Sequence, residues 1–312
     1  MTELKFNNGD TFPQIGLGTW LSKPHEVFDA VLVAIQTGYR HIDCAYIYRN
    51  EKEIGNALQY AFKNGWVKRE ELFITSKLWN SDHHPSRVQK AIERTLSDLQ
   101  IDYLDLYLMH WPIAFKPGIE QAKTANDLAT LDEIPLEVTW AEMHKLRQSG
   151  LTKHIGVSNF SISKLKHLIN TTGIVPENNQ VEIHPYFQQN EMLDFCISNN
   201  ILLTAYAPLG SRHLMNTEMG IDVNPVIKRI AENHNTSTSS IILAWGMSRG
   251  TIVIPKSVNQ KRIIDNFNST KVSLSISEIE EINQINQNLR QSKGLYAVLP
   301  EGYYTYENIW NT

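Results

Sequence analysis

The sequence predicts an α/β fold, and within that class a (β/α)8 TIM barrel. Eight short apolar segments with the composition of buried strands alternate along the chain with segments of helical periodicity. This alternation occupies most of the 312 residues, which is the pattern of a closed parallel barrel. A doubly wound sheet would need a Gly-x-Gly-x-x-Gly turn leading directly into a helix, and GLGTW (16–20) lacks that spacing.

The chain begins with two short extended segments on either side of Asn8-Gly9-Asp10, a hairpin turn signal. We expect this hairpin to plug one end of the barrel. The eight predicted strands are 17–20, 40–45, 72–78, 106–111, 154–159, 180–185, 202–209 and 251–257. The predicted helices are 26–38, 50–65, 84–100, 136–150, 161–173, 190–201, 225–237, 239–250, 259–269 and 275–289.

Two irregular segments, 112–135 and 211–223, interrupt the alternation. Both follow predicted strands, so we expect long functional loops at the C-terminal face of the barrel. The tail, about 290–312, contains four tyrosines and a tryptophan without periodicity. We expect residues 1–312 to form a single domain in which this tail closes the substrate pocket.

Composition excludes several classes of protein. The charge is nearly balanced, with 29 basic and 33 acidic residues, so we expect no nucleic-acid or membrane partner. Two cysteines, Cys44 and Cys196, lie in apolar runs and cannot form a disulfide scaffold or a zinc cluster. The N-terminus lacks a signal sequence and no apolar run is long enough to span a membrane, so we expect a cytoplasmic protein.

Four polar side chains mark the candidate catalytic site. Asp43, Lys77 and His110 lie at the ends of three successive predicted strands, and Tyr48 follows the first of them by five residues. The carboxyl ends of barrel strands carry active sites. We expect the Lys77 ammonium, held by Asp43, to lower the pKa of Tyr48 and make it a proton donor, with His110 orienting a carbonyl. Taken singly, each residue also has a structural explanation.

A hydride transfer needs a bound donor, because amino-acid side chains supply none. Lys256 and Ser257 end the last predicted strand and Arg262 lies in the first turn of the next helix, which is the composition of a phosphate site. Two cations there suit the 2′-phosphate of NADP rather than NAD. Tyr206 offers a face on which a nicotinamide ring can stack. Residues that end two other strands could bind its carboxamide: Ser158, Asn159 and Gln180.

The sequence resembles an aldo-keto reductase, and is most similar to the aldose and aldehyde reductase branch. The resemblance runs from about Phe6 to Leu289. It rests on the motifs GLGTW, GYRHIDCAYIYRNEKEIG, LFITSKLWNSDHHP, LDLYLMHWP, IGVSNF, NQVEIHP, AYAPLGS and IPKSV. It implies NADPH-dependent reduction of aldehydes or aldoses to alcohols, including sugar or sugar-acid aldehydes, by a monomer or a homodimer.

The resemblance also implies roles for individual residues. The catalytic residues are Asp43, Tyr48, Lys77 and His110. The cofactor-binding residues are Gly18, Thr19, Trp20, Asp43, Ser158, Asn159, Gln180, Tyr206, Leu209, Ser211, Lys256, Ser257, Val258, Arg262, Asp265 and Asn266. The substrate-binding residues are Trp20, Tyr48, Trp79, His110 and Trp111, and no metal is expected. Leu209 to Ser211 match the segment that covers the pyrophosphate in the family.

Three departures from the family pattern concern cofactor and substrate binding. Ala207 replaces a common serine and is followed by Pro208-Leu209-Gly210-Ser211-Arg212, Asp265 replaces a glutamate on the adenine side, and the tail matches poorly. Two other functions remain open. A cofactor-binding but non-catalytic protein would not oxidise NADPH with a generic aldehyde. A metal-dependent barrel hydrolase using Asp43 and His110 would lose its activity on chelation.

Overall fold

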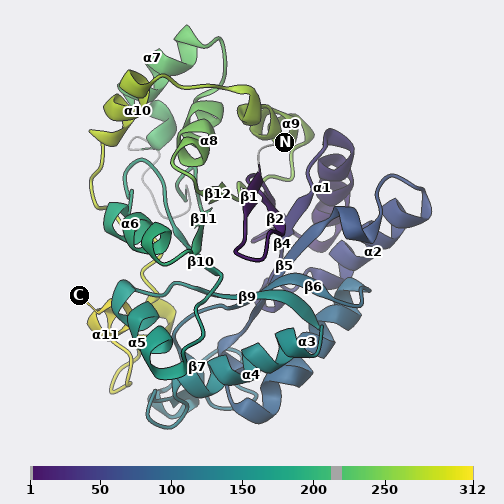
Figure 1. Cartoon of the computed structure of the whole chain (residues 1–312), viewed down its shortest axis with the longest axis vertical. Helices are drawn as coiled ribbons and strands as arrows, with labels where there is room; N and C mark the ends of the chain where they lie inside the picture. The colour runs from purple at the N-terminus through teal and green to yellow at the C-terminus, as the bar shows by residue number, and fades with distance from the viewer. Residues whose placement is uncertain (1–2, 212–219, 312) are drawn as a thin grey trace.

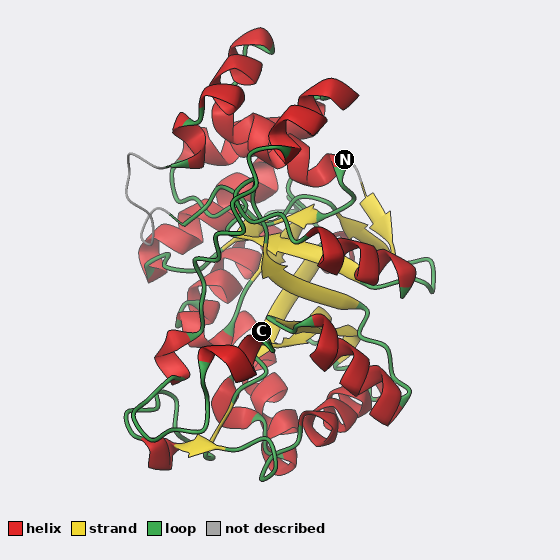
Figure 2. Ribbon diagram, turned by 90° about the vertical axis from the view of Figure 1, so that its left-hand side faces the viewer, coloured by secondary structure: helices red, strands yellow, loops and turns green. Residues whose placement is uncertain are grey.

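Eight parallel strands form one sheet in the computed structural model, which describes residues 3–211 and 220–311. The strand order is β12-β11-β10-β9-β6-β5-β4-β3. The bounds are β3 (Leu17–Gly18), β4 (His41–Asp43), β5 (Phe73–Leu78), β6 (Leu104–Met109), β9 (Thr152–Ser158), β10 (Asn178–Glu182), β11 (Leu202–Tyr206) and β12 (Ile252–Val253). Figure 1 shows these strands at the centre of a ring of helices, and Figure 2 shows the sheet from the side. The predicted α/β barrel is confirmed.

The first and last strands meet, which closes the ring. Ile15 bridges Val253 and Gly18 bridges Lys256, both in the parallel sense. Two backbone hydrogen bonds support this seam, from Gly16 to the Val253 oxygen and from Val253 to the Gln14 oxygen, each 2.9 Å long. Strand pairing around a closed ring leaves no free edge and brings all the carboxyl ends of the strands to one rim.

The helices follow the strands as the periodicity predicts. Their bounds are α1 (Pro24–Thr37), α2 (Glu51–Lys63), α3 (Pro85–Leu99), α4 (Leu136–Gln148), α5 (Ile162–Thr172), α6 (Asn190–Ser198), α7 (Pro225–Asn233), α8 (Thr238–Ser248), α9 (Gln260–Asn268), α10 (Ile276–Asn283) and α11 (Tyr306–Trp310). Local chemistry sets many of the ends. Pro85 begins α3, Gly38 ends α1 with φ 115°, and Ser275 forms a capping box with Glu278 at the start of α10. No helix of the described residues is long and apolar enough to cross a membrane.

The N-terminal hairpin plugs the barrel, as predicted. Strand β1 (Glu3–Lys5) pairs antiparallel with β2 (Thr11–Pro13), and the hairpin lies across the middle of the ring in Figure 1. Phe6 and Phe12 stack on Phe73 of β5, with ring centroids 6.0 and 4.1 Å away. Leu106 and Leu108 of β6 belong to the same buried cluster.

Alternation along the strands separates the inner core from the outer one. In β6, Leu106 and Leu108 contact the hairpin cluster, whereas Tyr107 and Met109 belong to the larger core shared with the helices. Successive side chains of a strand point to opposite faces, so β6, which is packed on both faces, is buried along its whole length.

Three local predictions were wrong. The segment 112–135 contains a small hairpin, β7 (Ala114–Phe115) paired with β8 (Leu128–Ala129), where no strand was expected. Helix α10 ends at Asn283 instead of continuing to Leu289, because the following backbone turns away and donates to the Tyr186 oxygen. The tail ends in the short helix α11, which Thr305 caps.

Candidate active site

The carboxyl ends of β4, β5 and β6 bring the four predicted catalytic side chains together. Asp43 is the last residue of β4, Lys77 lies one residue before the end of β5, and His110 directly follows β6. Tyr48 ends the short 3-10 helix η1 (Tyr46–Tyr48), which follows β4. Because parallel strands end at one rim, residues far apart in the sequence converge there.

Lys77 and Asp43 form a buried ion pair. Nζ of Lys77 lies 2.6 Å from Oδ1 of Asp43 and donates a second hydrogen bond of 2.8 Å to the Cys44 oxygen. The two side chains are 0% and 3% exposed. The other oxygen of Asp43 accepts a 2.7 Å hydrogen bond from Nε2 of Gln180. Burial is the largest single influence on Lys77 and acts to lower its pKa, but the charge and hydrogen bond of Asp43, together with Tyr48 and Cys44, outweigh it. The pKa of Lys77 is therefore raised and the ammonium stays charged.

Tyr48 lies beside this ammonium, with Nζ of Lys77 5.1 Å from the centre of its ring. Burial raises the pKa of Tyr48 to about 12; Lys77 acts to lower it and the Asp43 charge acts to raise it. The prediction that Lys77 lowers the pKa of Tyr48 below its usual value is therefore wrong for the protein alone, because the loss of hydration on burial outweighs the effect of one nearby cation. The phenol keeps its proton at neutral pH, which is the form that a general acid requires.

His110 is neutral in this environment. Burial lowers the pKa of His110 well below its usual range, and the charges of Lys77 and His83 act in the same direction. Its ring meets Tyr48 edge to face at 5.8 Å and Trp79 at 5.3 Å. A neutral imidazole carries one N–H, which can donate to a carbonyl oxygen beside the phenol.

Aromatic side chains from the strand ends and the tail surround this centre. Trp79 is stacked with Tyr296 at 5.8 Å, and Trp111 meets Tyr296 and Trp310 edge to face at 5.5 and 5.9 Å. The hydroxyl of Tyr296 accepts a 3.0 Å hydrogen bond from Asn80. The tail therefore lies against two of the predicted substrate residues, Trp79 and Trp111. A third predicted substrate residue, Trp20, is 47% exposed at the rim.

The residues predicted to meet the nicotinamide form one hydrogen-bond network with the catalytic centre. Tyr206 donates to Oδ1 of Asn159 at 2.7 Å, and Nδ2 of Asn159 donates to the His110 oxygen at 3.0 Å. Ser158 donates to the backbone oxygen of Gln180 at 2.8 Å, and Gln180 binds Asp43 as described above. Thr19 donates to the Asp43 backbone oxygen at 2.7 Å.

The structure explains why position 18 is a glycine, which the sequence did not reveal. A Cβ on this residue would lie 2.7 Å from the Ile254 oxygen. Its N–H also donates to the Pro255 oxygen at 3.1 Å. Only glycine allows the first strand to approach the last one this closely.

The predicted phosphate residues lie at the start of α9, next to the barrel seam. Asn259 caps this helix by accepting from the Arg262 backbone, and the Ser257 hydroxyl accepts from the Asn259 N–H, both at 3.1 Å. Lys256 reaches across the seam to the Leu21 oxygen at 3.3 Å, and Arg262 is exposed. Hydroxyl, amide and cationic donors at a helix N-terminus suit a phosphate group.

The other predicted cofactor residues differ in their contacts and in their burial. Asp265 is paired with Lys261 at 2.6 Å, one turn earlier in α9. Asn266 is buried, and Val258 packs partly buried against the core. Leu209 also packs against that core, and Ser211 donates its N–H to Gln291 at 2.6 Å. Arg212 lies outside the described residues.

Several residues that support the site were not identified from the sequence. Asn50 donates to the backbone oxygens of Thr19 and Ser22, at 2.9 and 3.1 Å, and fixes the loop after β3. Glu51 is buried between Ser76 and Thr95, and burial raises its pKa to about 7. Their position within three residues of Tyr48 was the available signal.

Glu120 of the long loop 112–135 was also missed. Its carboxylate bonds Tyr46 and Arg49, and its backbone oxygen accepts from the Trp79 indole at 2.8 Å. The loop is therefore held against the segment that carries Tyr48, although the bonded residues lie 74 and 71 positions apart in sequence.

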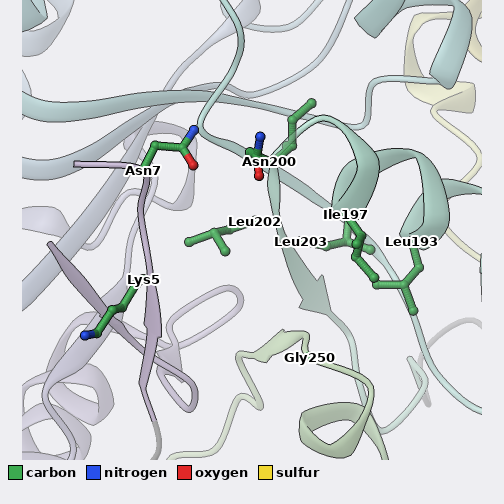
Figure 3. A pocket seen from close by; sticks show the side chains of 9 residues that line it. Lys5, Asn7, Leu193, Ile197, Asn200, Leu202, Leu203 and Gly250 are labelled. Carbon is green, nitrogen blue, oxygen red and sulfur yellow. The ribbon is translucent and has the colours of Figure 1, made fainter. Parts of the chain in front are cut away.

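A cavity lies at the end of the barrel opposite the catalytic residues. It opens between the hairpin residues Lys5 and Asn7, helix α6, and the start of β11 (Figure 3). Lys5 is the one charged side chain among its described lining residues, so it offers no catalytic set. The described residues contain no cluster of three or more histidine, cysteine or acidic side chains that could hold a metal. In the HHP motif, His84 caps α3 and His83 is buried.

The fold and the polar cluster at its rim define a (β/α)8-barrel enzyme. Comparison with known proteins then gives the family: residues 14–287 match the model of the aldo/keto reductase family, and the chain belongs to that family. The chain is therefore an oxidoreductase of the aldo-keto reductase type.

Similar proteins agree with this assignment. An aldo/keto reductase of Synechocystis sp. is 45% identical over 100% of this chain and 97% of its own length. Aldose reductase B of Dictyostelium discoideum is 47% identical, covering 89% and 90% of the two chains. The structure of the aldose reductase from Schistosoma japonicum superposes with a TM-score of 0.88 at 43% identity, covering 95% of this chain and 96% of that one.

Proposed function

We propose that this protein reduces aldehydes and aldoses to alcohols with NADPH, and that Tyr48 is the general acid. The observation that carries the proposal is the buried pair of Lys77 and Asp43 beside a protonated phenol. A buried ion pair is costly unless it is fully hydrogen-bonded, and such pairs often add little stability over apolar residues of the same volume. A role in proton transfer explains its position.

The chain's own residues accomplish the proton transfer. A reduced nicotinamide, when bound, supplies the hydride that adds to the carbonyl carbon. Tyr48 gives its hydroxyl proton to the oxygen that gains negative charge. The Lys77 ammonium stabilises the phenolate left behind, and Asp43 holds the ammonium in place. His110, which is neutral, donates an N–H to the same oxygen and orients the carbonyl.

The residues at the start of α9 fit the adenosine phosphate of NADP. Lys256, Ser257 and Arg262 provide two cations and a hydroxyl around the helix N-terminus. A phosphate at the ribose 2′ position adds charge that these groups can pair with, whereas a hydroxyl there does not. The names of the relatives, among them aldose reductases, support a nicotinamide-dependent reaction on aldehydes or sugars.

The aromatic wall favours substrates with an apolar body. In the proposed complex, the tail (about 290–312) closes the substrate pocket, and the carbonyl group reaches Tyr48 and His110 between Trp79 and Trp111. The stacking of Tyr296 on Trp79 supports this arrangement, because it brings the tail over the strand ends.

Substitution of Tyr48 by phenylalanine tests the proposal. The ring and its contacts remain, so the affinity for NADP+ should stay within about twofold of that of the wild type, while turnover of glyceraldehyde or benzaldehyde should fall by about 10²- to 10⁴-fold or more. The exposed Tyr60→Phe variant serves as a matched control with normal turnover. Wild-type turnover in Tyr48→Phe would reject the assignment of the general acid. Absence of NADPH oxidation by the wild-type protein, with a panel of aldehydes and aldoses, would reject the function itself.

A further inference from the structure

The beginning of the tail is fastened to the end of β10 by a buried carboxylate. Glu182 is 0% exposed, and its oxygens accept the backbone N–H groups of Gln291, at 2.9 and 3.1 Å, and of Ser292, at 2.7 Å. His184 approaches the same carboxylate at 2.9 Å. These charge-assisted hydrogen bonds fix the backbone of Gln291 independently of its side chain.

The side chain of Gln291 reaches a different part of the site. Its Oε1 accepts the backbone N–H of Ser211 at 2.6 Å. Ser211 is 8% exposed and ends the segment Leu209 to Ser211, which matches the segment that covers the cofactor pyrophosphate in the family. The acceptor of this N–H is thus a side chain that stands 80 positions further along the sequence.

The other half of the Gln291 amide is unsatisfied. Its Nε2 is buried and has no hydrogen-bond partner among the described residues. A buried donor without a partner costs free energy that offsets most of what the bond to Ser211 contributes. The link between Ser211 and Gln291 is therefore weak overall, and an acceptor that replaces Oε1 can release the amide at little cost.

We propose that Gln291 is a positioning residue of the cofactor site. Its amide oxygen accepts the hydrogen bond of the Ser211 N–H until a phosphate oxygen of the dinucleotide displaces it. The proposal rests on the proposed function, since it assumes that Ser211 meets the pyrophosphate. A phosphate oxygen is a charged acceptor and binds an N–H more strongly than a neutral amide does. One N–H cannot serve both acceptors well, so the Gln291 side chain competes with the dinucleotide.

The sign of the effect on binding follows from this competition. Removing the amide in Gln291→Ala should lower the Kd for NADP+ by about two- to tenfold, which is the range expected for one neutral hydrogen bond. Gln291→Glu places a carboxylate at the same point. It should raise the Kd more than tenfold, because it binds the N–H more tightly and repels the phosphates. Binding is measured by the quenching of tryptophan fluorescence, without any turnover.

Gln287 provides matched controls. It precedes Gln291 by four residues in the same segment and is exposed, and its backbone N–H donates to the Tyr186 oxygen. Gln287→Ala and Gln287→Glu make the same chemical changes away from Ser211, so both should bind NADP+ like the wild type. Hydrogen exchange of the Ser211 amide, in protein without dinucleotide, should be faster in Gln291→Ala than in the wild type or in Gln287→Ala.

The outcomes separate this proposal from the proposed function. Wild-type protein that binds NADP+, together with Gln291→Ala that binds it equally or more weakly, would overturn the displacement and leave the function standing. Unchanged exchange of the Ser211 amide in Gln291→Ala would also overturn the displacement. If the wild type binds neither NADP+ nor NADPH, the proposed function and the displacement are both refuted.

Discussion

Replacing Lys77 by methionine should destabilise the protein by about 3–5 kcal/mol, although methionine has nearly the same length and volume. Lys77 is fully buried, and its ammonium is the cation bound to Asp43 at 2.6 Å. Without it, the buried side chain of Asp43 keeps one hydrogen-bond donor among the described residues, Nε2 of Gln180 at 2.7 Å. Removal of one partner of a buried pair leaves an uncompensated charge, which accounts for the size of the loss.

The double variant Lys77→Met/Asp43→Asn tests that account directly. It removes both charges, and the Asn oxygen can still accept from Gln180. We therefore expect it to recover most of the lost stability and to lie within about 2 kcal/mol of the wild type. Turnover should not recover, because the phenolate of Tyr48 would have no neighbouring cation.

Urea denaturation at pH 7 and turnover of an aldehyde are measured for the wild type, both single variants and the double variant. Lys52→Met is a matched control, since the Lys52 side chain is 79% exposed and its pairing with Asp98 is long, at 3.9 Å. Such a pair contributes about 0–1 kcal/mol. A double variant no more stable than Lys77→Met would refute the reasoning about the buried charge. Wild-type turnover in the double variant would refute the role of the cation.

Three further predictions concern other parts of the molecule. Burial raises the pKa of Glu51 from 4.5 to about 7, so the folded state favours the protonated carboxyl. The contribution of this carboxyl to stability is fully present below pH 4.5 and is lost as the pH rises through 7. The pH-dependent part of the free energy of unfolding from Glu51 is at most about 3 kcal/mol. In denaturant titrations the Glu51→Gln variant should therefore lose less stability than the wild type between pH 5 and 8, and equal losses would contradict the prediction. Arg262→Ala should raise the KM for NADPH about tenfold or more while that for NADH barely changes, and an equal effect on both would place the 2′-phosphate elsewhere. Tyr296→Ala removes a ring stacked on Trp79, so the KM for benzaldehyde should rise about fivefold or more with an unchanged Kd for NADP+. An unaltered KM would exclude Tyr296 from the substrate pocket.

Much of the fold and the position of the catalytic set could be predicted from local patterns. The two periods of hydrophobicity distinguish strands from helices, and the order of these segments identifies the barrel. Asp43, Lys77 and His110 were found because each lies at or near the end of an apolar run that predicts a strand. Their convergence then follows from the parallel arrangement of the strands.

Other features depended on which segments the closed barrel brings into contact. Gly18 is required because the last strand passes within 2.7 Å of where its Cβ would be, and nothing in GLGTW indicates that neighbour. The same holds for the bond between Ser211 and Gln291, whose partners are 80 positions apart. The tail has no periodicity, so its stacking on Trp79 could not be derived.

The sequence by itself determined the order of strands and helices and the chemical identity of the groups at the rim, because both depend on residues close together in the chain. Only the tertiary structure decided the protonation of those groups. The pKa of Tyr48 is raised, not lowered, because hydration lost on burial outweighs the effect of one ammonium. Burial is a property of the packed molecule, and it arises from all the segments that surround the phenol.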